Sequence, residues 1–253
     1  VGGHLDHARG DEFIATRPRV AMTIYNKLGA DAEGRLLAKE ADVLADNGAY
    51  TDYAPAITGI AAYRIDNMYR IPNVRSRFRL VYTNKAPSGG FRGFGNAQGA
   101  FAIESTMDML AETLGMDPVE LRLRNLVQQG DTTTHGFYIG SIGLRECIEG
   151  ATRAIGWREG RNRNGSPAAE GRVPRGVGIA CCIHVAGFRG FFKEFDGSSA
   201  RVRVNEDGHV FILTGEVDIG QGSRTIMAQI AAEELSVPIE DVRVSDVDTN
   251  VTP

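Results

Sequence analysis

Residues 87–101 read PSGGFRGFGNAQGAF, and this stretch carries the most distinctive pattern in the chain. Four glycines fall within positions 89–95, with Phe91, Arg92 and Phe94 standing between them. Glycine lets the backbone turn sharply and approach a ligand closely, whereas phenylalanine side chains are usually buried. The stretch therefore predicts a shaped loop that presents an arginine between two aromatic rings.

A helix is expected directly after this loop, over residues 97–114. Its apolar residues recur at spacings of four, three and four, which gives a single apolar stripe of Ile103, Met107, Leu110 and Leu114. Outward from this helix, the chain mixes strands and helices. Strands are expected at 19–27, 36–46, 77–83, 175–187, 200–205, 209–214 and 240–248, and further helices at 55–66, 117–127, 142–156 and 223–236. This order predicts an α+β fold.

One segment divides the chain. Residues 158–172 read REGRNRNGSPAAEGR, which is charged, contains several glycines and lacks apolar anchors, as linkers do. We therefore expect part of a first domain at 1–157, a linker at 158–172 and the truncated start of a second domain at 173–253.

The overall composition is that of an ordinary globular protein. The chain has 253 residues, 42% hydrophobic residues and a net charge of −4, so no general attraction to nucleic acid or to an anionic membrane is expected. No apolar run approaches the ~20 residues of a membrane helix. Three cysteines without a CxxC pair predict no disulfide framework and no metal ligation, and we expect Cys181 and Cys182 to be buried packing groups. A cytoplasmic protein fits best.

A second glycine site follows the strand predicted at 209–214. Residues 218–225 read DIGQGSRT, in which two glycines flank Gln221 at the start of the helix predicted at 223–236. Backbone N–H groups at a helix start can bind an anion or a polar ligand. No lysine follows as in a P-loop, and the third glycine of GxGxxG is missing, which argues against a nucleotide-binding domain.

Together the two loops resemble a known family. GGFRGFGNAQGAFAIE, the preceding IDNMYRIPNV and the later GEVDIGQGSRTIMAQIAAEEL are similar to the molybdenum-cofactor subunit of the xanthine dehydrogenase/aldehyde oxidase family. RGDEF near the start and DPVELRLRNLVQQGD in the middle extend the resemblance over most of the chain. It implies that both expected domains are of the molybdenum-cofactor-binding type.

The resemblance implies roles for individual residues. Phe91 and Arg92 match loop residues beside the metal and the cofactor, and the second loop matches a segment that touches the pterin through Ile219, Gly220 and Gln221. Positions that match or lie near substrate-facing ones are Ile60, Phe94 and Phe188. No protein side chain would ligate the metal.

Purely structural roles remain possible for several of these residues. Arg92 could bond only to loop carbonyls, one of the two phenylalanines could simply anchor the loop by packing, and Gln221 could bind its own backbone.

The resemblance also implies a reaction, a cofactor and partners. Members of the family hydroxylate or reduce a carbon of a heterocycle, an aldehyde or an aryl thioester. The cofactor would be molybdenum-molybdopterin, in the cytosine dinucleotide form if the source is bacterial. Electrons would pass to iron–sulfur clusters and FAD on other domains or subunits, in an assembly that we expect to be oligomeric.

Three features of the sequence depart from the family pattern. The segment that carries the family's general-base glutamate is absent, and Glu216, Glu233 and Glu234 do not replace it, so we expect no catalytic residue in these 253 residues and no turnover by the chain alone. Ile60 stands where purine-acting members carry an arginine, which disfavours xanthine. Gly93 stands where carbon-monoxide-oxidising members carry a cysteine, which disfavours a copper-bridged site.

An aldehyde, another N-heterocycle or an aryl-CoA thioester such as 4-hydroxybenzoyl-CoA remain as substrate classes. The alternative function is a non-catalytic structural or interaction fragment that shares the fold.

Overall fold

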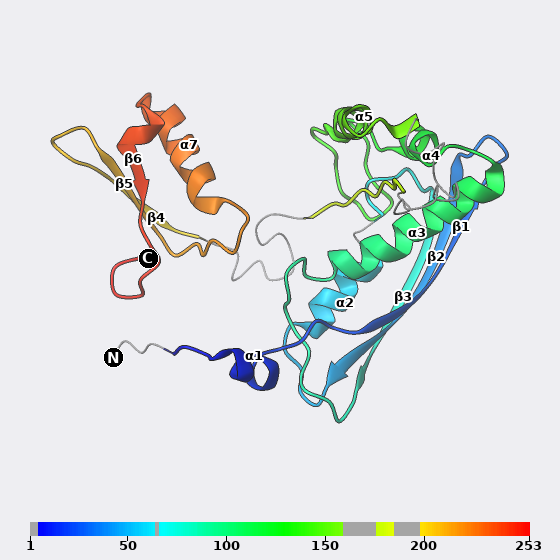
Figure 1. The fold of residues 1–253 in the computed structure, drawn as a ribbon, viewed down its shortest axis with the longest axis horizontal. Coiled ribbons are helices and arrows are strands. Elements are labelled where there is room, and N and C mark those ends of the chain that lie inside the picture. The colour runs from blue at the N-terminus through cyan, green and yellow to red at the C-terminus, as the bar shows by residue number, and fades with distance from the viewer. Residues whose placement is uncertain (1–4, 64–65, 159–175, 185–197) are drawn as a thin grey trace, which may run out of the picture. The chain divides into compact units, whose positions relative to one another are not determined.

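The computed structural model describes residues 5–63, 66–158, 176–184 and 198–253 (Figure 1). Contacts between Cα atoms divide the chain into two compact units. The large unit is His7–His184, and the small unit combines Val1–Asp6 with Val185–Pro253. The described part of the chain contains no helix that is long and apolar enough to cross a membrane.

The large unit is built on a three-stranded sheet in the order β1-β2-β3. Strand β1 (Met22–Ala30) pairs antiparallel with β2 (Leu36–Gly48), and β3 (Asn73–Tyr82) pairs parallel with β2. Parallel neighbours need a crossover, since a short turn cannot return the chain to the same end of the sheet. Helix α2 (Ala54–Tyr63) lies in this crossover.

The two faces of this sheet differ in character. From Lys39 to Asn47 in β2, the odd-numbered residues, such as Val43 and Ala45, are buried, as the period of two in a strand requires. Three of the even-numbered residues, Glu40, Asp42 and Asp46, form an acidic row on the other face. There the carboxylate of Glu40 accepts a hydrogen bond from Arg75, and that of Asp42 pairs with Arg77.

Two helices, α2 and α3 (Asn96–Leu114), lie across one face of the sheet (Figure 1). The expected apolar stripe of α3 contributes Ile103 and Met107, both fully buried, to the main core. Helix α4 (Pro118–Asn125) packs against α3, and α5 (Leu144–Ala154) packs against α4. A short α1 (Arg9–Ala15) has no buried residue.

Helix α4 begins where a cap is available. Asp117 is its N-cap, and its Oδ1 accepts hydrogen bonds from the backbone N–H groups of Val119 at 2.8 Å and Glu120 at 3.2 Å. Pro118 follows in the first turn, where its missing N–H costs nothing.

Residues 176–184 differ from the buried strand that the apolar run predicts. They make no strand pairing within the described part of the chain, and their exposure alternates along the segment. Ile179, Cys181 and Ile183 face the main core, whereas Cys182 is exposed. The expectation that both adjacent cysteines are buried is therefore wrong for Cys182, because an extended segment over a core buries only one of two neighbours.

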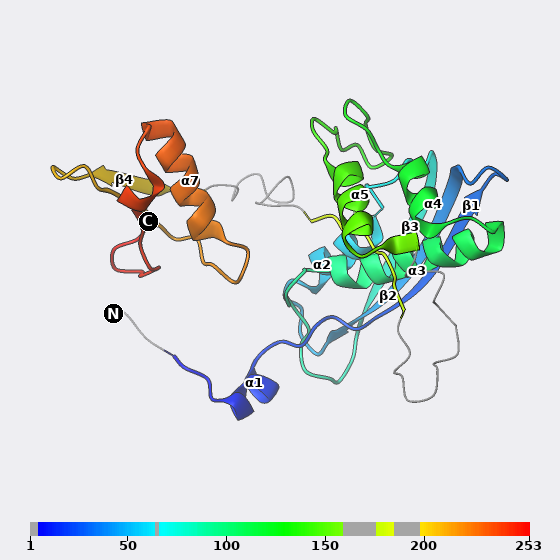
Figure 2. The ribbon, with the colours of Figure 1, turned by 45° about the horizontal axis from the view of Figure 1, so that its top comes forward.

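The small unit has a three-stranded sheet in the order β4-β5-β6. Strands β4 (Ala200–Val204) and β5 (Val210–Thr214) form an antiparallel hairpin, and β6 (Val242–Val244) pairs parallel with β5. Figure 2 shows α7 (Ser223–Leu235) beside this sheet. A short 3-10 helix, η1 (Ile239–Asp241), precedes β6. The core between helix and sheet contains Val210, Ile212, Val242, Met227, Ala228 and Ala231.

The predicted α+β class is confirmed. Each strand and helix expected from sequence periodicity in the described ranges is present, except for the strand at 175–187. Most of the predicted linker, 158–172, lies outside the described residues.

Candidate functional site

The glycine loop before α3 has a backbone that few residues can adopt. Gly93, Phe94 and Gly95 are consecutive residues with positive φ angles of 96°, 44° and 92°. The N–H of Phe94 donates to the carbonyl of Phe91 at 3.0 Å, and the N–H of Asn96 donates to that of Gly93 at 2.8 Å. Positive φ is strained for phenylalanine, so surrounding contacts must hold this turn in place.

Gly95 brings the loop against the backbone of α2. A Cβ atom at this position would lie 2.3 Å from the carbonyl oxygen of Ile57, so glycine is required both by the close approach and by the φ angle. The neighbouring Phe94 packs on a small cluster that includes Val20 and Ile57. Its ring meets that of Tyr53 edge to face at 5.9 Å. Phe94 therefore anchors the loop and is only partly exposed.

The entry to the loop is tied to the end of β2. The hydroxyl of Ser88 donates to the carbonyl of Asp46 at 2.7 Å, and its N–H donates to that of Asn47 at 3.0 Å. Hydrogen bonds from the Lys85 ammonium, the Thr83 hydroxyl and a backbone N–H lower the pKa of Asp46 to about 2. This carboxylate stays charged at neutral pH and fixes the segment that leads into the loop.

Arg19 supports the loop from the segment before β1. Its Nη2 donates to the carbonyl of Arg92 at 2.9 Å, and its guanidinium carbon lies 4.6 Å from the centre of the Phe91 ring. Its Nη1 donates to Oε1 of Gln98 at 3.5 Å, and Gln98 in turn donates to the carbonyl of Val20 at 3.0 Å. Nothing in the local sequence indicates this arrangement, because its partners lie more than 70 positions away.

Phe91 and Arg92 are exposed to solvent. Phe91 is 53% exposed, and the exposed Arg92 side chain makes no hydrogen bond or ion pair with another residue that the structure describes. A cavity of about 680 Å³ adjoins Phe91. Residues that line it include Arg17, Tyr50, Asp52, Pro87, Gly90 and Phe91. The loop thus presents the Phe91 ring at a cavity and exposes the neighbouring Arg92 cation.

The other two residues that the sequence predicts to face substrate are Ile60 and Phe188. Ile60 lies in α2 and is buried, with 7% of its surface exposed. Phe188 lies outside the described residues.

In the second glycine loop, Gln221 binds its own backbone. Its Oε1 accepts from the N–H of Ile219 at 2.7 Å, and its Nε2 donates to the carbonyl of Val217 at 2.8 Å. Gly220 and Gly222 have φ angles of 108° and 77°, and a Cβ on Gly222 would meet no atom within 4 Å. The loop is therefore open to solvent, but the amide of Gln221 is already bonded.

Asp218 binds a backbone N–H group of the second glycine loop, shortly before α7. Its Oδ1 accepts a hydrogen bond from the N–H of Gly220 at 2.8 Å. That bond is the main cause of the lowered pKa of Asp218. One of the N–H donors of this loop, that of Gly220, thus already binds an internal carboxylate.

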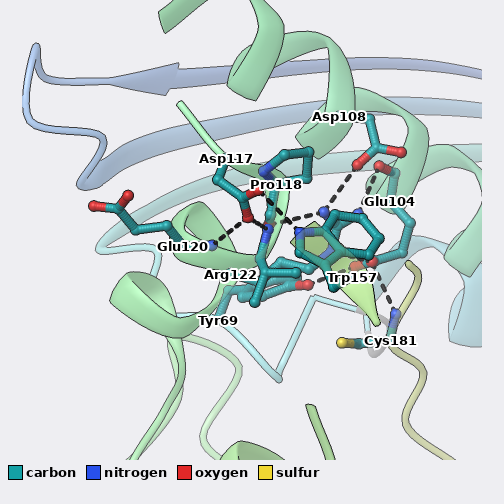
Figure 3. A network of polar contacts seen from close by, with 10 residues as sticks. Tyr69, Glu104, Asp108, Asp117, Pro118, Glu120, Arg122, Trp157 and Cys181 are labelled. Carbon is teal, nitrogen blue, oxygen red and sulfur yellow. Dashed lines mark hydrogen bonds and ion pairs between the residues drawn. The ribbon is translucent and has the colours of Figure 1, made fainter. Parts of the chain in front are cut away.

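A buried ionic network holds α3, the helix that follows the first glycine loop (Figure 3). The fully buried Arg122 of α4 donates from Nε to Oε2 of Glu104 in α3 at 2.8 Å. The same oxygen accepts from the N–H of Cys181 at 2.9 Å, and the other one accepts from the hydroxyl of Tyr69 at 2.6 Å. The network joins α3, α4 and the segment 176–184.

The titration behaviour of the network follows from burial and charge. Burial tends to lower the pKa of Arg122, but the charge of Glu104 outweighs it and raises this pKa. Burial, and then the Glu104 carboxylate, raise the pKa of Tyr69. Burial also raises the pKa of Cys181 to about 11. All three groups keep their ordinary neutral-pH protonation state, so we interpret the network as structural.

A second buried pair lies near the end of α2. Nζ of Lys39 in β2 is 2.7 Å from Oδ2 of Asp66, and both side chains are almost completely buried. Nε2 of His135 is 3.4 Å from the other carboxylate oxygen. Burial tends to raise the pKa of Asp66, but the nearby His135 and the charge of Lys39 outweigh it, and the pKa is lowered.

Sequence reasoning missed Arg19 and both buried ionic groups. A usable signal existed for Glu104 and Arg122, since each is a charged residue next to apolar core positions, Ile103 and Leu121, in a predicted helix. In the described part of the chain, no three His, Cys, Asp or Glu side chains gather in a way that could hold a metal ion.

Comparison with known proteins yields two domain matches. The molybdopterin cofactor-binding domain matches residues 5–126, and a second molybdopterin cofactor-binding domain matches residues 150–253.

Individual relatives agree with these matches. The chain is 37% identical over 248 residues to the putative xanthine dehydrogenase molybdenum-binding subunit of Escherichia coli K12, which covers 97% of this chain and 32% of the relative. It is 35% identical to the aldehyde oxidoreductase of Megalodesulfovibrio gigas over 99% of this chain and 27% of that protein. The crystal structure of quinoline 2-oxidoreductase from Pseudomonas putida 86 superposes with a TM-score of 0.80 and 29% identity, covering 94% of this chain and 32% of that one. The chain thus spans about a third of the length of these relatives.

Proposed function

Because the chain belongs to the xanthine dehydrogenase/aldehyde oxidase family of molybdopterin-dependent oxidoreductases, we propose that it forms part of the cofactor and substrate site of such an enzyme. In this proposal, Phe91 and Arg92 contact the cofactor from the first loop. Ile219, Gly220 and Gln221 contact it from the second. The observation that carries the proposal is the exposed Arg92, which a supported glycine loop presents without a described partner.

The first loop fits the cofactor that the family implies. A pyrophosphate-bearing pterin is anionic and has many hydrogen-bonding edges. The Arg92 guanidinium can hold such oxygens through two parallel hydrogen bonds. Arg19 adds a second cation behind the loop. The exposed Phe91 ring offers a flat apolar surface beside the cavity. When bound, the cofactor supplies the redox chemistry at the metal, while these residues bind it and exclude water.

The second loop fits only after a local change. Asp218 accepts a hydrogen bond from the Gly220 N–H, which an anionic ligand could use, and Gln221 is bonded within its own loop. Cofactor binding through these residues requires both side chains to move. This observation favours the alternative function, a structural fragment without bound cofactor, for the small unit taken by itself.

The substrate is proposed to be flat and aromatic, or an aldehyde. The related proteins are named for xanthine, aldehyde and quinoline, so their own names leave the class open. We propose that Phe94 and Phe188 face the substrate and that Ile60, which carries no charge, disfavours purines. An N-heterocycle other than xanthine, an aldehyde or an aryl-CoA thioester such as 4-hydroxybenzoyl-CoA then remains.

The proposal extends to the cofactor form and to the partners. We propose a cytosine dinucleotide form of the cofactor for a bacterial source. Iron–sulfur clusters and FAD on other domains or subunits accept the electrons, in a cytoplasmic oligomeric assembly. The chain divides into two cofactor-binding domains, 1–157 and 173–253, joined by the linker 158–172.

Metal and pterin content test the function. The protein is purified with its natural neighbours, and molybdenum per chain and pterin fluorescence are measured for the wild type and for R92A and Q221A. Molybdenum near one per chain in the wild type, with a large loss in R92A, supports the proposal. The control is R75A, because Arg75 is an exposed arginine whose ion pair with Glu40 lies on the outer face of the sheet.

Three results would count against the proposal. Absence of molybdenum and pterin from the complete assembly refutes the function. Full occupancy in Q221A, with loss in R92A, limits cofactor recognition to the first loop. Strong turnover of hypoxanthine, in a panel with 4-hydroxybenzoyl-CoA, nicotinate-like rings and aldehydes, refutes the interpretation of Ile60.

A further inference from the structure

Arg19 makes three contacts with the glycine loop and its helix at once. One guanidinium nitrogen bonds the carbonyl of Arg92, the guanidinium carbon lies 4.6 Å from the centre of the Phe91 ring, and the other terminal nitrogen reaches Gln98. Phe91 and Arg92 are the two residues of this loop proposed to contact the cofactor. Arg19 therefore holds the main chain of one and the ring of the other.

Arg19 is itself held in place. The N–H of Gly89 donates to the carbonyl of Pro18 at 3.1 Å, and Arg19 and Gly89 form an isolated parallel bridge. On the other side, Gln98 in the first turn of α3 donates to the carbonyl of Val20. The segment 18–20 thus touches the loop before and after its strained turn, and the guanidinium lies between these two attachments.

The chemistry of this position requires arginine. A guanidinium is flat and carries donors in a fixed fork, so it can stack on an aromatic ring while bonding two oxygens. A lysine ammonium is a compact charge that cannot reproduce this combination. Positive φ angles at Gly93, Phe94 and Gly95 mean that the turn needs such external support.

We propose that Arg19 is a positioning residue: it fixes the Phe91 ring and the Arg92 main chain in their binding arrangement before the cofactor arrives. This rests on the proposed function of the first loop. A loop ordered in advance loses less conformational freedom on binding, which strengthens binding without any new contact to the ligand.

The first measurement is amide hydrogen exchange on the cofactor-free chain. In R19A, exchange of the N–H groups of Phe94 and Asn96 is expected to rise about tenfold, which corresponds to ~1.4 kcal/mol of local opening. R19K is expected to behave like R19A. The control R75A removes another arginine and leaves exchange in the loop unchanged. Wild-type exchange in R19A overturns the proposal.

The second measurement uses the loaded holoenzyme and separates positioning from simple loss of stability. The electron paramagnetic resonance spectrum of reduced molybdenum is compared between wild type, R19A, F91A and the double variant. If Arg19 positions Phe91, the spectrum shifts in R19A, and R19A/F91A shows the same spectrum as F91A. A lower loaded fraction with an unshifted spectrum means that Arg19 only stabilises the fold, and it overturns the proposal.

The proposed function and this inference fail in different ways. A wild-type holoenzyme without molybdenum refutes the function, whatever the exchange data show. A wild type with molybdenum, together with an R19A variant of equal content, spectrum and loop exchange, refutes only the role of Arg19.

Discussion

Replacing Arg122 by methionine is expected to destabilise the large unit severely. Arg122 is fully buried, and methionine preserves much of its length while removing the charge and every donor. The carboxylate of Glu104, of which only 5% is exposed, would lose its ionic partner and keep two neutral donors, the Tyr69 hydroxyl and the Cys181 N–H. Breaking one side of a buried ion pair costs ~3–5 kcal/mol. Because two hydrogen-bond donors to Glu104 remain, we expect the loss in the free energy of unfolding to lie near the lower end of this range, at about 3 kcal/mol.

The chain offers a suitable probe for this measurement. Trp157 is the only tryptophan, it is 6% exposed, and its Nε1 donates to Oδ2 of Asp117 at 2.9 Å. Its fluorescence in urea therefore reports unfolding of the large unit, and far-UV circular dichroism checks that the probe is faithful. R75M serves as a control, because Arg75 is exposed and its loss should leave the unfolding midpoint nearly unchanged.

A double variant tests the cause of the loss. E104Q keeps hydrogen bonding to Tyr69 and Cys181 but removes the negative charge. If the cost of R122M arises from an uncompensated charge, E104Q/R122M loses less stability than the sum of the two single variants by more than about 1 kcal/mol. A cost of R122M below about 1 kcal/mol, or strict additivity, refutes the reasoning.

Three further predictions concern other parts of the large unit. The G95A variant is expected to lower the free energy of unfolding by ~2–4 kcal/mol, since residue 95 has a positive φ angle and the added Cβ would lie 2.3 Å from the Ile57 carbonyl oxygen. In the control G130A the added Cβ meets no atom within 4 Å, so only the positive φ angle is unfavourable. Equal losses of stability for the two variants in urea unfolding would contradict this. Because the pKa of Asp66 is lowered in the folded protein, its pairing with Lys39 stabilises the folded state above pH ~4, and this contribution is lost as the pH falls further. The difference in the free energy of unfolding between wild type and K39M should therefore shrink below pH ~4. At pH 8 the exposed Cys147 and Cys182 should react quickly with a thiol reagent, whereas Cys181, which is buried and has a pKa of about 11, should react slowly. Equal reaction rates of the three thiols, followed by mass spectrometry, would refute the burial of Cys181.

The sequence predicts the secondary elements well where periodicity is strong. The stripe from Ile103 to Leu114 and the alternation in 77–83 both correspond to observed elements, α3 and β3. It does not predict that β3 pairs parallel with β2, because periodicity describes a strand and not its neighbour. Helix α1 was missed because it buries no residue and so has no apolar stripe.

The sequence predicts the local backbone shape of the first glycine loop but not the long-range contacts that support it. The glycines at 93 and 95 do adopt positive φ, as a shaped loop requires. Phe94 packs against a buried cluster beside the loop and Gln221 binds its own backbone, whereas the roles of both residues toward substrate and cofactor stay predictions. Arg19 could not be found from the sequence, because a side chain 73 positions from its partner leaves no local pattern.

The charged outer face of the large sheet has a consequence for the solubility of the protein. Strand β3 lies at the edge of the sheet in the described part of the chain, and an unpaired edge invites strands from other molecules. Arg75, Arg77 and Arg79 project from alternate positions of this edge strand. A second copy that approached edge to edge would bring two rows of arginines together, and like charges opposite each other repel. The arginines that bind the carboxylates of β2 thus also keep separate molecules apart, and added salt should weaken that protection by screening them.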